Sequence, residues 1–302
     1  MGTSVREQGQ TGEGFSFGRT GSVLAKVAYA IFWGWLILRW LNNWLLPAGV
    51  GAKPSESFID ATLVREVSES LAFAVEFLPS LATGLWITIV LTVISIVLGF
   101  VIAVPLSVAR VYGNYSSYVS LAYTELIRGT PLLAQLFILY YGLPLTNWIR
   151  VLPHVGQGLV PGQAFWVAII GFTINSAAYQ GEYIRSALIS IESGQMTAAR
   201  GLGLTKIQAI RYVILPQGLR YAIPAWSNEL VYLIKYSSLA SFVTVDELYN
   251  VASTIAAENF EYTSIFTLVA ILYLGLVISA SNLMDRVEET VSIPGLGQDT
   301  AR

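Results

Sequence analysis

The stretch "GQMTAARGLGLTKIQAIRYVILPQ", from Gly194 to Gln217, is basic and fit for water in a chain that is otherwise largely apolar. It carries three cationic side chains (Arg200, Lys206 and Arg211) and no acidic one. Of the 302 residues, 54% are hydrophobic and 12% are charged, and the mean hydropathy is +0.61. Because soluble domains carry about a quarter charged residues, this composition predicts an integral membrane protein.

The local pattern of the stretch predicts two short helices in series. Gly201 and Gly203 tolerate the left-handed backbone that closes a helix. Thr205 then opens a second helix, because T-K-I-Q fits a capping box in which Gln208 bonds back to the backbone of Thr205. Pro216 is expected to end this second helix. The residues alone allow two interpretations: an amphipathic connector on the lipid surface, or a docking element for a cytoplasmic partner.

Six segments are apolar over the roughly 20 residues that cross the hydrocarbon core. They lie at about 24–46, 80–109, 119–142, 164–188, 222–243 and 263–284. The first is longer than the apolar part of a signal peptide, about 7–15 residues, so we expect it to be retained. Arg39 lies among the tryptophans of this first segment, and we expect it to snorkel outward or to stack on an indole.

The distribution of lysine and arginine predicts which loops face the cytoplasm. With the basic stretch placed inside, eleven of the 17 cations are cytoplasmic, three are external and three lie within spans. Cytoplasmic loops are enriched in Lys and Arg. Both termini are therefore expected on the cytoplasmic side of a multi-pass protein of the cell membrane.

Composition also excludes several kinds of site and partner. The formal net charge of −2 argues against a nucleic-acid partner. The lack of cysteine rules out disulfides and thiolate metal sites, and the single histidine, His154, rules out a histidine-cluster site. No metal ligands are assigned.

Ionisable residues within the predicted spans are costly to bury. Glu125 and Arg128 are three residues apart, as are Glu182 and Arg185, so each pair is expected to neutralise itself on one helix face. The sequence Gly129-Thr130-Pro131 is expected to kink the third span. Two further residues, Glu229 and Lys235, are six apart and cannot pair in this way, so we expect each to face the bundle interior or a partner subunit.

The basic stretch resembles the cytoplasmic loop motif of ABC importer permeases, in which E-A-A is followed by glycine and then by I-x-L-P. This chain has Thr197-Ala198-Ala199, then Gly203, then Val213-Ile214-Leu215-Pro216. Two positions depart from the motif: Thr197 replaces the usual glutamate and Val213 the usual isoleucine. The polar contact that this glutamate makes with the ATPase must therefore differ or be absent here.

Three more segments resemble the polar amino acid branch of that family. They are "YTELIRGTPLLAQLFILYYGLP" (Tyr123–Pro144), "SAAYQGEYIRSALISIESGQ" (Ser176–Gln195) and "LIKYSSLAS" (Leu233–Ser241), where Tyr236 replaces Asp or Asn. The resemblance implies an all-α, type I ABC importer-like bundle of six transmembrane helices, a five-helix core plus one N-terminal helix. It divides the chain into a cytoplasmic tail (1–23), the additional transmembrane helix (24–46), an extracytoplasmic loop (47–76), the permease core (77–290) with its coupling loop (191–220), and a second cytoplasmic tail (291–302).

The function implied by the resemblance is that of a membrane-spanning permease subunit, which imports a polar amino acid such as glutamine, glutamate, arginine or histidine. The chain has no G-x-x-x-x-G-K-[ST] phosphate loop, so it is not expected to be an enzyme or to bind a cofactor. ATP and Mg would bind the partner ATPase. The expected partners are two ABC ATPase subunits, a second permease copy or paralogue, an extracytoplasmic solute-binding protein and membrane lipid. The residues expected to contact the ATPase are Gly194, Gln195, Met196, Thr197, Ala198, Ala199, Gly203, Leu215 and Pro216.

A zwitterionic amino acid needs acceptors for its ammonium and donors for its carboxylate. Polar residues within the spans could supply both, and the candidates are Gln135, Asn175, Tyr179, Glu182, Asn228, Glu229, Lys235 and Ser237. The alternative is that they only fix helices to one another. A permease for another small solute and an ion-coupled secondary transporter remain alternatives, although the latter is expected to have repeated halves. An intramembrane enzyme fits poorly.

Overall fold

The computed structural model describes residues 19–45, 53, 56–66, 68–153, 155–156 and 161–291, and all regular structure within them is helical. The expectations for the tails before residue 19 and after residue 291, and for His154, concern residues outside those ranges. The long helices are α1 (Arg19–Leu45), α3 (Glu69–Tyr112), α7 (Gln163–Ser190), α10 (Leu215–Tyr236) and α12 (Tyr262–Val291). The short elements are α2 (Ala61–Arg65), α4 (Tyr115–Arg128), α5 (Leu132–Phe137), the π-helical turn η1 (Ile138–Gly142), α6 (Leu145–Arg150), α8 (Ser193–Gly201), α9 (Lys206–Ala209), the π-helical turn η2 (Ile210–Ile214), the 3₁₀ helix η3 (Ser237–Val243) and α11 (Leu248–Asn259).

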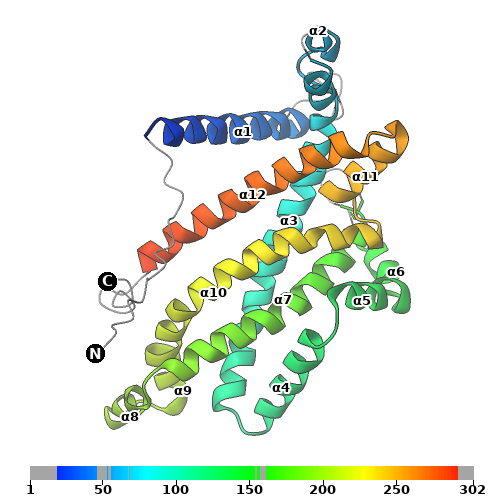
Figure 1. Cartoon of the computed structure of the whole chain (residues 1–302). Helices are drawn as coiled ribbons and strands as arrows, with labels where there is room; N and C mark the ends of the chain where they lie inside the picture. The colour runs from blue at the N-terminus through cyan, green and yellow to red at the C-terminus, as the bar shows by residue number, and fades with distance from the viewer. Residues whose placement is uncertain are drawn as a thin grey trace, which may run out of the picture.

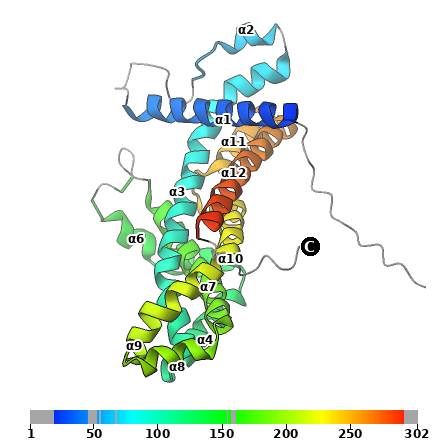
Figure 2. The ribbon, with the colours of Figure 1, turned by 90° about the vertical axis from the view of Figure 1, so that its left-hand side faces the viewer.

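The helix α3 is the axis of the molecule. It packs along α7, which packs against α10, and α10 in turn packs against α12. Figure 1 shows α7, α10 and α12 running in similar directions with α3 crossing them. The short helices α8 and α9 lie at one end, and α2 and α11 lie towards the other, as Figure 2 also shows.

Two helices of the described chain, α3 and α12, are long and apolar enough by themselves to cross a membrane, with mean hydropathies of 3.0 and 2.2 over their most apolar windows. The other four predicted spans all form helices: α1, the α4–α5–η1 series, α7, and α10 continued by η3. That the six segments cross the membrane stays a prediction.

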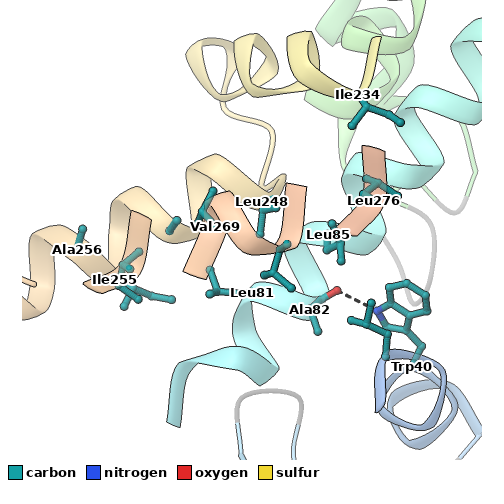
Figure 3. Close-up of a cluster of buried hydrophobic side chains, with 14 of the residues drawn as sticks. Trp40, Leu81, Ala82, Leu85, Ile234, Leu248, Ile255, Ala256, Val269 and Leu276 are labelled. Atoms are coloured by element: carbon teal, nitrogen blue, oxygen red, sulfur yellow. Dashed lines mark hydrogen bonds between the residues drawn. The ribbon is translucent and has the colours of Figure 1, made fainter. Parts of the chain in front are cut away.

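The largest buried cluster joins α1, α3, α11 and α12 (Figure 3). Trp40 of α1 packs into it and donates a hydrogen bond from its indole nitrogen to the carbonyl of Ala82, at 2.9 Å. Gly84 of α3 permits close approach to α11, because a Cβ there would lie 2.9 Å from the Cα of Leu248. In lipid, where apolar surface gains little by leaving its surroundings, such close packing is the main attraction between helices.

The third predicted span is broken at Gly129-Thr130-Pro131, as the sequence predicted. α4 ends at Arg128, and Pro131 has the extended backbone (φ −62°, ψ 135°) that starts α5. The break frees backbone carbonyls, and the side-chain amide of Gln135 donates to two of them, those of Ile127 (2.7 Å) and Thr130 (3.1 Å).

The expectation that Pro216 ends a helix is wrong. The helix that begins at Lys206 continues through the π-helical turn η2 into α10, and Pro216 lies in the first turn of α10. The π-helical turn interrupts the regular i→i−4 pattern directly before Pro216, so the missing N–H of proline is less costly there than inside a regular helix. The side-chain amide of Gln217 donates to the carbonyl of Val213, at 2.7 Å, within the same distorted turn.

The expectation for Arg39 is also wrong. Its side chain is fully buried, lies over the ring of Phe58 at 5.0 Å, and donates to the carbonyl of Lys53. It neither snorkels nor stacks on an indole, because residues between α1 and α3 cover it. The pattern of apolar residues in α1 did not indicate that residues outside this helix would bury Arg39.

Candidate functional site

The basic stretch forms a helix–turn–helix unit at the end of the molecule opposite α2 (Figure 1). α8 is closed by Gly203, whose φ is +88°. The N–H of Gly203 donates to the carbonyl of Arg200 (3.0 Å), and the N–H of Leu204 donates to that of Ala199 (3.2 Å). These two bonds make a Schellman motif, so the predicted glycine closure is confirmed at Gly203. Gly201 is instead the last residue of α8.

The second helix of the unit starts at the predicted capping box. The N–H of Gln208 donates to Thr205 Oγ1 at 3.3 Å, and the N–H of Thr205 donates to Gln208 Oε1 at 2.8 Å. Only Leu204 separates this box from the closure at Gly203. The angle between α8 and α9 is therefore set by local bonds.

The unit is anchored to three long helices. The ammonium of Lys206 donates to the carbonyl of Tyr112, the last residue of α3, at 2.8 Å. Met196 packs against a buried cluster that includes Ile184 of α7 and Ile214 of η2, next to α10. A force on α8 would therefore reach the ends of α3, α7 and α10 together.

The outer surface of the unit combines apolar and cationic side chains. Leu202 is 86% exposed and Ile207 is 77% exposed. Tyr212, which the sequence reasoning missed, is exposed beside Arg211, whose guanidinium lies 5.6 Å from its ring centre. An aromatic residue next to a cation in a water-compatible segment was the available signal.

The predicted contact residues of this loop divide by exposure. Those exposed are Gly194, Gln195, Thr197, Ala198, Gly203 and Pro216, whereas Met196 and Leu215 are half-buried and Ala199 is buried. Thr197 Oγ1 donates back to the carbonyl of Ser193, at 3.4 Å. The position that usually holds a glutamate therefore presents no charge on this surface.

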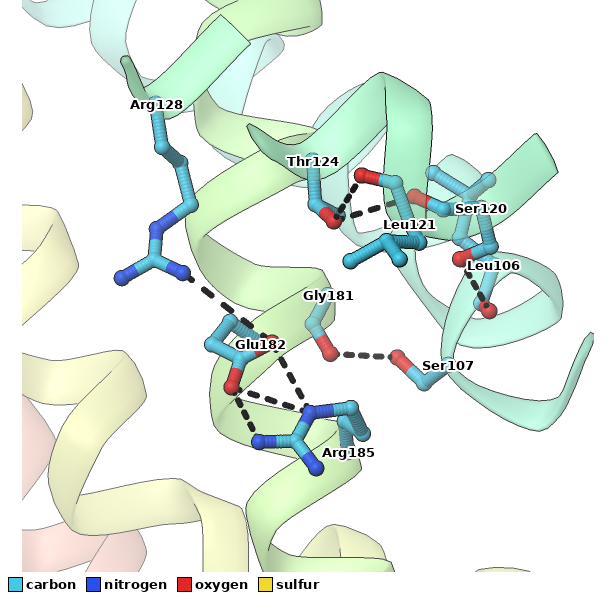
Figure 4. A network of polar contacts seen from close by, with 9 residues as sticks. All are labelled: Leu106, Ser107, Ser120, Leu121, Thr124, Arg128, Gly181, Glu182 and Arg185. Carbon is cyan, nitrogen blue, oxygen red and sulfur yellow. Dashed lines mark hydrogen bonds and ion pairs between the residues drawn. The ribbon is translucent and has the colours of Figure 1, made fainter. Parts of the chain in front are cut away.

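A second polar group, shown in Figure 4, joins α4 to α7. Glu182 and Arg185 form the predicted pair, with Arg185 Nε 2.9 Å from both carboxylate oxygens. The predicted pair of Glu125 with Arg128 is wrong: Arg128 Nη1 lies 4.0 Å from Glu182 Oε2, while Glu125 is exposed. The guanidinium of Arg128 also lies 5.3 Å from the ring centre of Tyr179. Two arginines thus share one carboxylate. Glu125 is within electrostatic range of Arg185, and Arg110 is within range of Glu182, so three arginines and two glutamates leave one net positive charge.

A third, buried set of polar side chains ties α7 to its neighbours. Asn175 Nδ2 donates to Gln135 Oε1 at 3.1 Å, which connects α7 to the break before α5. Ser176 Oγ donates to Glu229 Oε1 at 2.9 Å, which connects α7 to α10. Gln180 accepts from the indole of Trp226 and donates to the carbonyl of Ile96, at 3.0 Å. The sequence reasoning missed Ser176, Gln180 and Trp226.

The remaining predicted residues are scattered. Glu229 faces the bundle interior, one of the two places expected for it, whereas Lys235 is exposed beside the ring of Tyr232, and its other expected place, at a partner subunit, stays a prediction. Asn228 is exposed, and Ser237 is buried, with its hydroxyl donating to the carbonyl of Ile234 at 2.8 Å. The structure therefore groups Tyr179 with Glu182, and Gln135 with Asn175, and leaves Asn228 and Lys235 outside both groups. Among the residues that the structure describes, no group of three or more His, Asp or Glu side chains could hold a metal.

Comparison with protein families matches residues 95–293 to the binding-protein-dependent transport system inner membrane component. The chain is 38% identical over 201 residues to the probable amino-acid ABC transporter permease protein YckA of Bacillus subtilis, covering 66% of this chain and 84% of YckA. It is 34% identical over 218 residues to the glutamine transport system permease protein GlnP of Escherichia coli, covering 72% of this chain and 94% of GlnP.

Solved structures agree with this match. The crystal structure of an amino acid ABC transporter with histidines superposes with a TM-score of 0.60 at 28% identity, covering 78% of this chain and 99% of that one. The inward-facing MetNI methionine ABC transporter has the same fold, with a TM-score of 0.58 at 24% identity, covering 75% of this chain and all of that one. The family match begins within α3 and so leaves α1 and α2 outside it.

Proposed function

Because this chain belongs to the family of binding-protein-dependent transport system inner membrane components, we propose that it is the permease subunit of an ABC importer for a polar amino acid, driven through the unit formed by α8 and α9. Its relatives include amino-acid permeases. The single observation that carries the proposal is the locally braced, exposed α8–α9 unit, anchored to α3, α7 and α10.

The α8–α9 unit would act as the mechanical input. Two ATPase subunits would bind ATP and Mg, one beneath each of two permease chains, which are identical or paralogous. The Schellman motif at Gly203 and the capping box at Thr205 hold the unit rigid. Movement of an ATPase cleft would therefore pass to the long helices and would not be absorbed by bending between α8 and α9. Since Thr197 carries no charge, we infer that the docking contact rests on Leu202, Ile207 and nearby cations.

The group of Arg128, Glu182 and Arg185 is the best candidate for recognising the substrate's carboxylate. Its side chains are 22–33% exposed, so a solute can reach them, and the second arginine is not fully neutralised. In a region of low dielectric, an unbalanced positive charge strongly favours an anion. This changes the assignment of Glu182, which was a candidate acceptor for the ammonium, to a residue that holds two arginines in position.

The proposed location is the cell membrane with both termini in the cytoplasm. An extracytoplasmic solute-binding protein would deliver the amino acid at the α2–α11 end. The excess of lysine and arginine in the α8–α9 end supports this orientation. A reporter that is active only outside the cytoplasm should therefore give no signal when it is fused to either terminus.

The function is tested in proteoliposomes that contain the permease with its genomically neighbouring ATPase and binding protein. We expect uptake of a labelled polar amino acid that requires ATP on the side of the membrane where the ATPase lies. Collapsing the ion gradients should leave this uptake unchanged. Uptake by the permease alone, driven by a proton or sodium gradient, would overturn the proposal in favour of a secondary transporter. ATP-dependent uptake of a different class of solute would support the ABC mechanism but contradict the proposal that the substrate is a polar amino acid.

A further inference from the structure

A pocket of about 740 Å³ lies between α1, α3, α10 and α12. Its volume is within the range of about 300–1,000 Å³ that is typical of ligand sites. None of the residues proposed above for substrate or for the ATPase lines it. One of its walls, α1, lies outside the residues matched by the family.

The pocket forms where α1, after contacting α12 near Gly275 and Ser279, diverges from it. At that point the ring of Phe32 packs on Gly275, where a Cβ would lie 2.8 Å from Phe32 Cζ. One turn along α12, the indole of Trp33 donates to Ser279 Oγ at 2.8 Å. Figure 1 shows the two helices separating from there towards Arg19 and Val291.

The lining of the pocket is amphipathic along its length. One end is apolar, and its residues include Ile89, Leu230 and Leu276. The other end, nearer the start of α1 and the end of α12, carries Lys26, Asn282, Asp285 and Arg286. From Leu276 to Arg286 the helix rises by about 15 Å, at 1.5 Å per residue. That is half of the roughly 30 Å hydrocarbon core, so the pocket matches one leaflet.

A buried hydroxyl is a second indication of a ligand. Thr92 lines the pocket, is 2% exposed, and its Oγ1 has no hydrogen-bond partner in the described part of the chain. An unmet hydroxyl in an apolar environment costs free energy. A rotation about χ1 of Thr92 would turn this hydroxyl towards the pocket, where an acceptor within the apolar part of a ligand, such as an ester carbonyl, would satisfy it.

We propose that this pocket binds one phospholipid whose headgroup carries both a phosphate and a primary ammonium, as in phosphatidylethanolamine. The phosphate lies between Lys26 and Arg286, the ammonium faces Asp285, and an acyl chain follows α12 towards Leu276. Two cations and one carboxylate match a headgroup with both charges better than a purely anionic one. The inference rests on the proposed membrane location but not on transport.

Native mass spectrometry of the full chain, released from detergent, tests the site. With phosphatidylethanolamine, phosphatidylglycerol and phosphatidylcholine added in equal amounts, we expect one phosphatidylethanolamine retained per chain. Replacing the cations together (Lys26→Gln with Arg286→Gln) should weaken retention about tenfold, the scale of lost charge-assisted hydrogen bonds. Asp285→Asn should remove the preference over phosphatidylcholine. The matched control is Arg150→Gln, an exposed cation outside the pocket.

A filling variant guards against misfolding of the charge variants. Val93 lines the pocket and is 49% exposed, so Val93→Trp should occupy the space without disturbing the buried core. It should lose the lipid while it keeps the circular dichroism spectrum and elution volume of the wild type. Equal retention of all three lipids, retention unchanged in Val93→Trp, or protection of the pocket by the chain's own N-terminal residues in crosslinking would each overturn the proposal. Because no ATPase or substrate is present, failure of transport leaves this result intact.

Discussion

Arg128 of α4 and Glu182 of α7 meet across two helices, with Nη1 4.0 Å from Oε2, on a carboxylate that Arg185 already holds. Arg128 is the last residue of α4, directly before the break at Gly129-Thr130-Pro131, and points to Glu182 (Figure 4). Because Arg185 bonds to the same carboxylate, the positive charge of Arg128 is only partly neutralised.

Arg128→Gln should raise the KM for uptake about tenfold, because a hydrogen bond to a charged group contributes about 1.5–3 kcal/mol. The turnover rate of ATP hydrolysis at saturating substrate should change less. Uptake kinetics in proteoliposomes measure both. Glu288→Gln, exposed near the end of α12, is the control and should leave KM unchanged. Equal KM values for wild type and Arg128→Gln would remove Arg128 from the substrate pathway.

Gly203→Val should abolish ATP-driven uptake while the chain still inserts and assembles. The φ of +88° at Gly203 lies in the left-handed region, where a β-branched residue costs roughly 1–3 kcal/mol and distorts the turn. Space is not the limit, since a Cβ there meets nothing within 4 Å. Gly203→Asn tolerates this backbone better and should keep most uptake. Similar uptake by both variants would show that the turn does not transmit force.

Lys206→Gln should weaken the coupling of ATP hydrolysis to uptake more than it weakens binding of the ATPase. Its ammonium ties the α8–α9 unit to the carbonyl of Tyr112 at the end of α3. Without that bond, the ATPase is expected to bind and to hydrolyse ATP, but with about two- to fivefold fewer amino acids imported per ATP, for one lost charge-assisted bond at an exposed site. The ratio of uptake to phosphate release measures this. An unchanged ratio would contradict the anchoring role, and Arg150→Gln controls for loss of charge.

Gln135→Leu should lower the thermal midpoint of the protein in detergent. Its side-chain amide donates to the carbonyls of Ile127 and Thr130 at the break and accepts from the buried amide of Asn175. A buried donor left without an acceptor, as that of Asn175 would be, costs about 1–3 kcal/mol. Gln195→Leu, on the exposed surface of α8, should leave the midpoint within experimental scatter. If both variants melt together with the wild type, water replaces the amide at the break.

The predictions that came from short stretches of sequence were the most accurate. The capping box at Thr205, the closure at Gly203 and the break before Pro131 all depend on neighbouring backbone groups and residues within a few positions. Helices were recovered at all six apolar segments. The end assigned to Pro216 failed because a proline is compatible with both the end of one helix and the first turn of the next.

The candidate substrate residues were predicted less well. Their polarity within apolar segments was a sound signal, but it did not distinguish a residue that meets solute from one that joins helices. Gln135, Asn175 and Glu229 are buried and bonded to other helices or to the break, whereas Glu182 stays partly exposed. Long side chains have several partners within reach, so spacing along one helix could not assign Arg128 to Glu182.

By itself, the sequence determined the all-helical class, the coupling-loop motif and the positions of its turns, because these follow from composition and from bonds within a few residues. Only the tertiary structure decided which helix Arg128 reaches, how Lys206 joins the loop to α3, and what covers Arg39. It alone revealed the pocket between α1 and α12. Each of these features depends on how helices far apart in sequence cross one another. Side-chain packing between the helices sets the crossing, and no local sequence pattern encodes that packing.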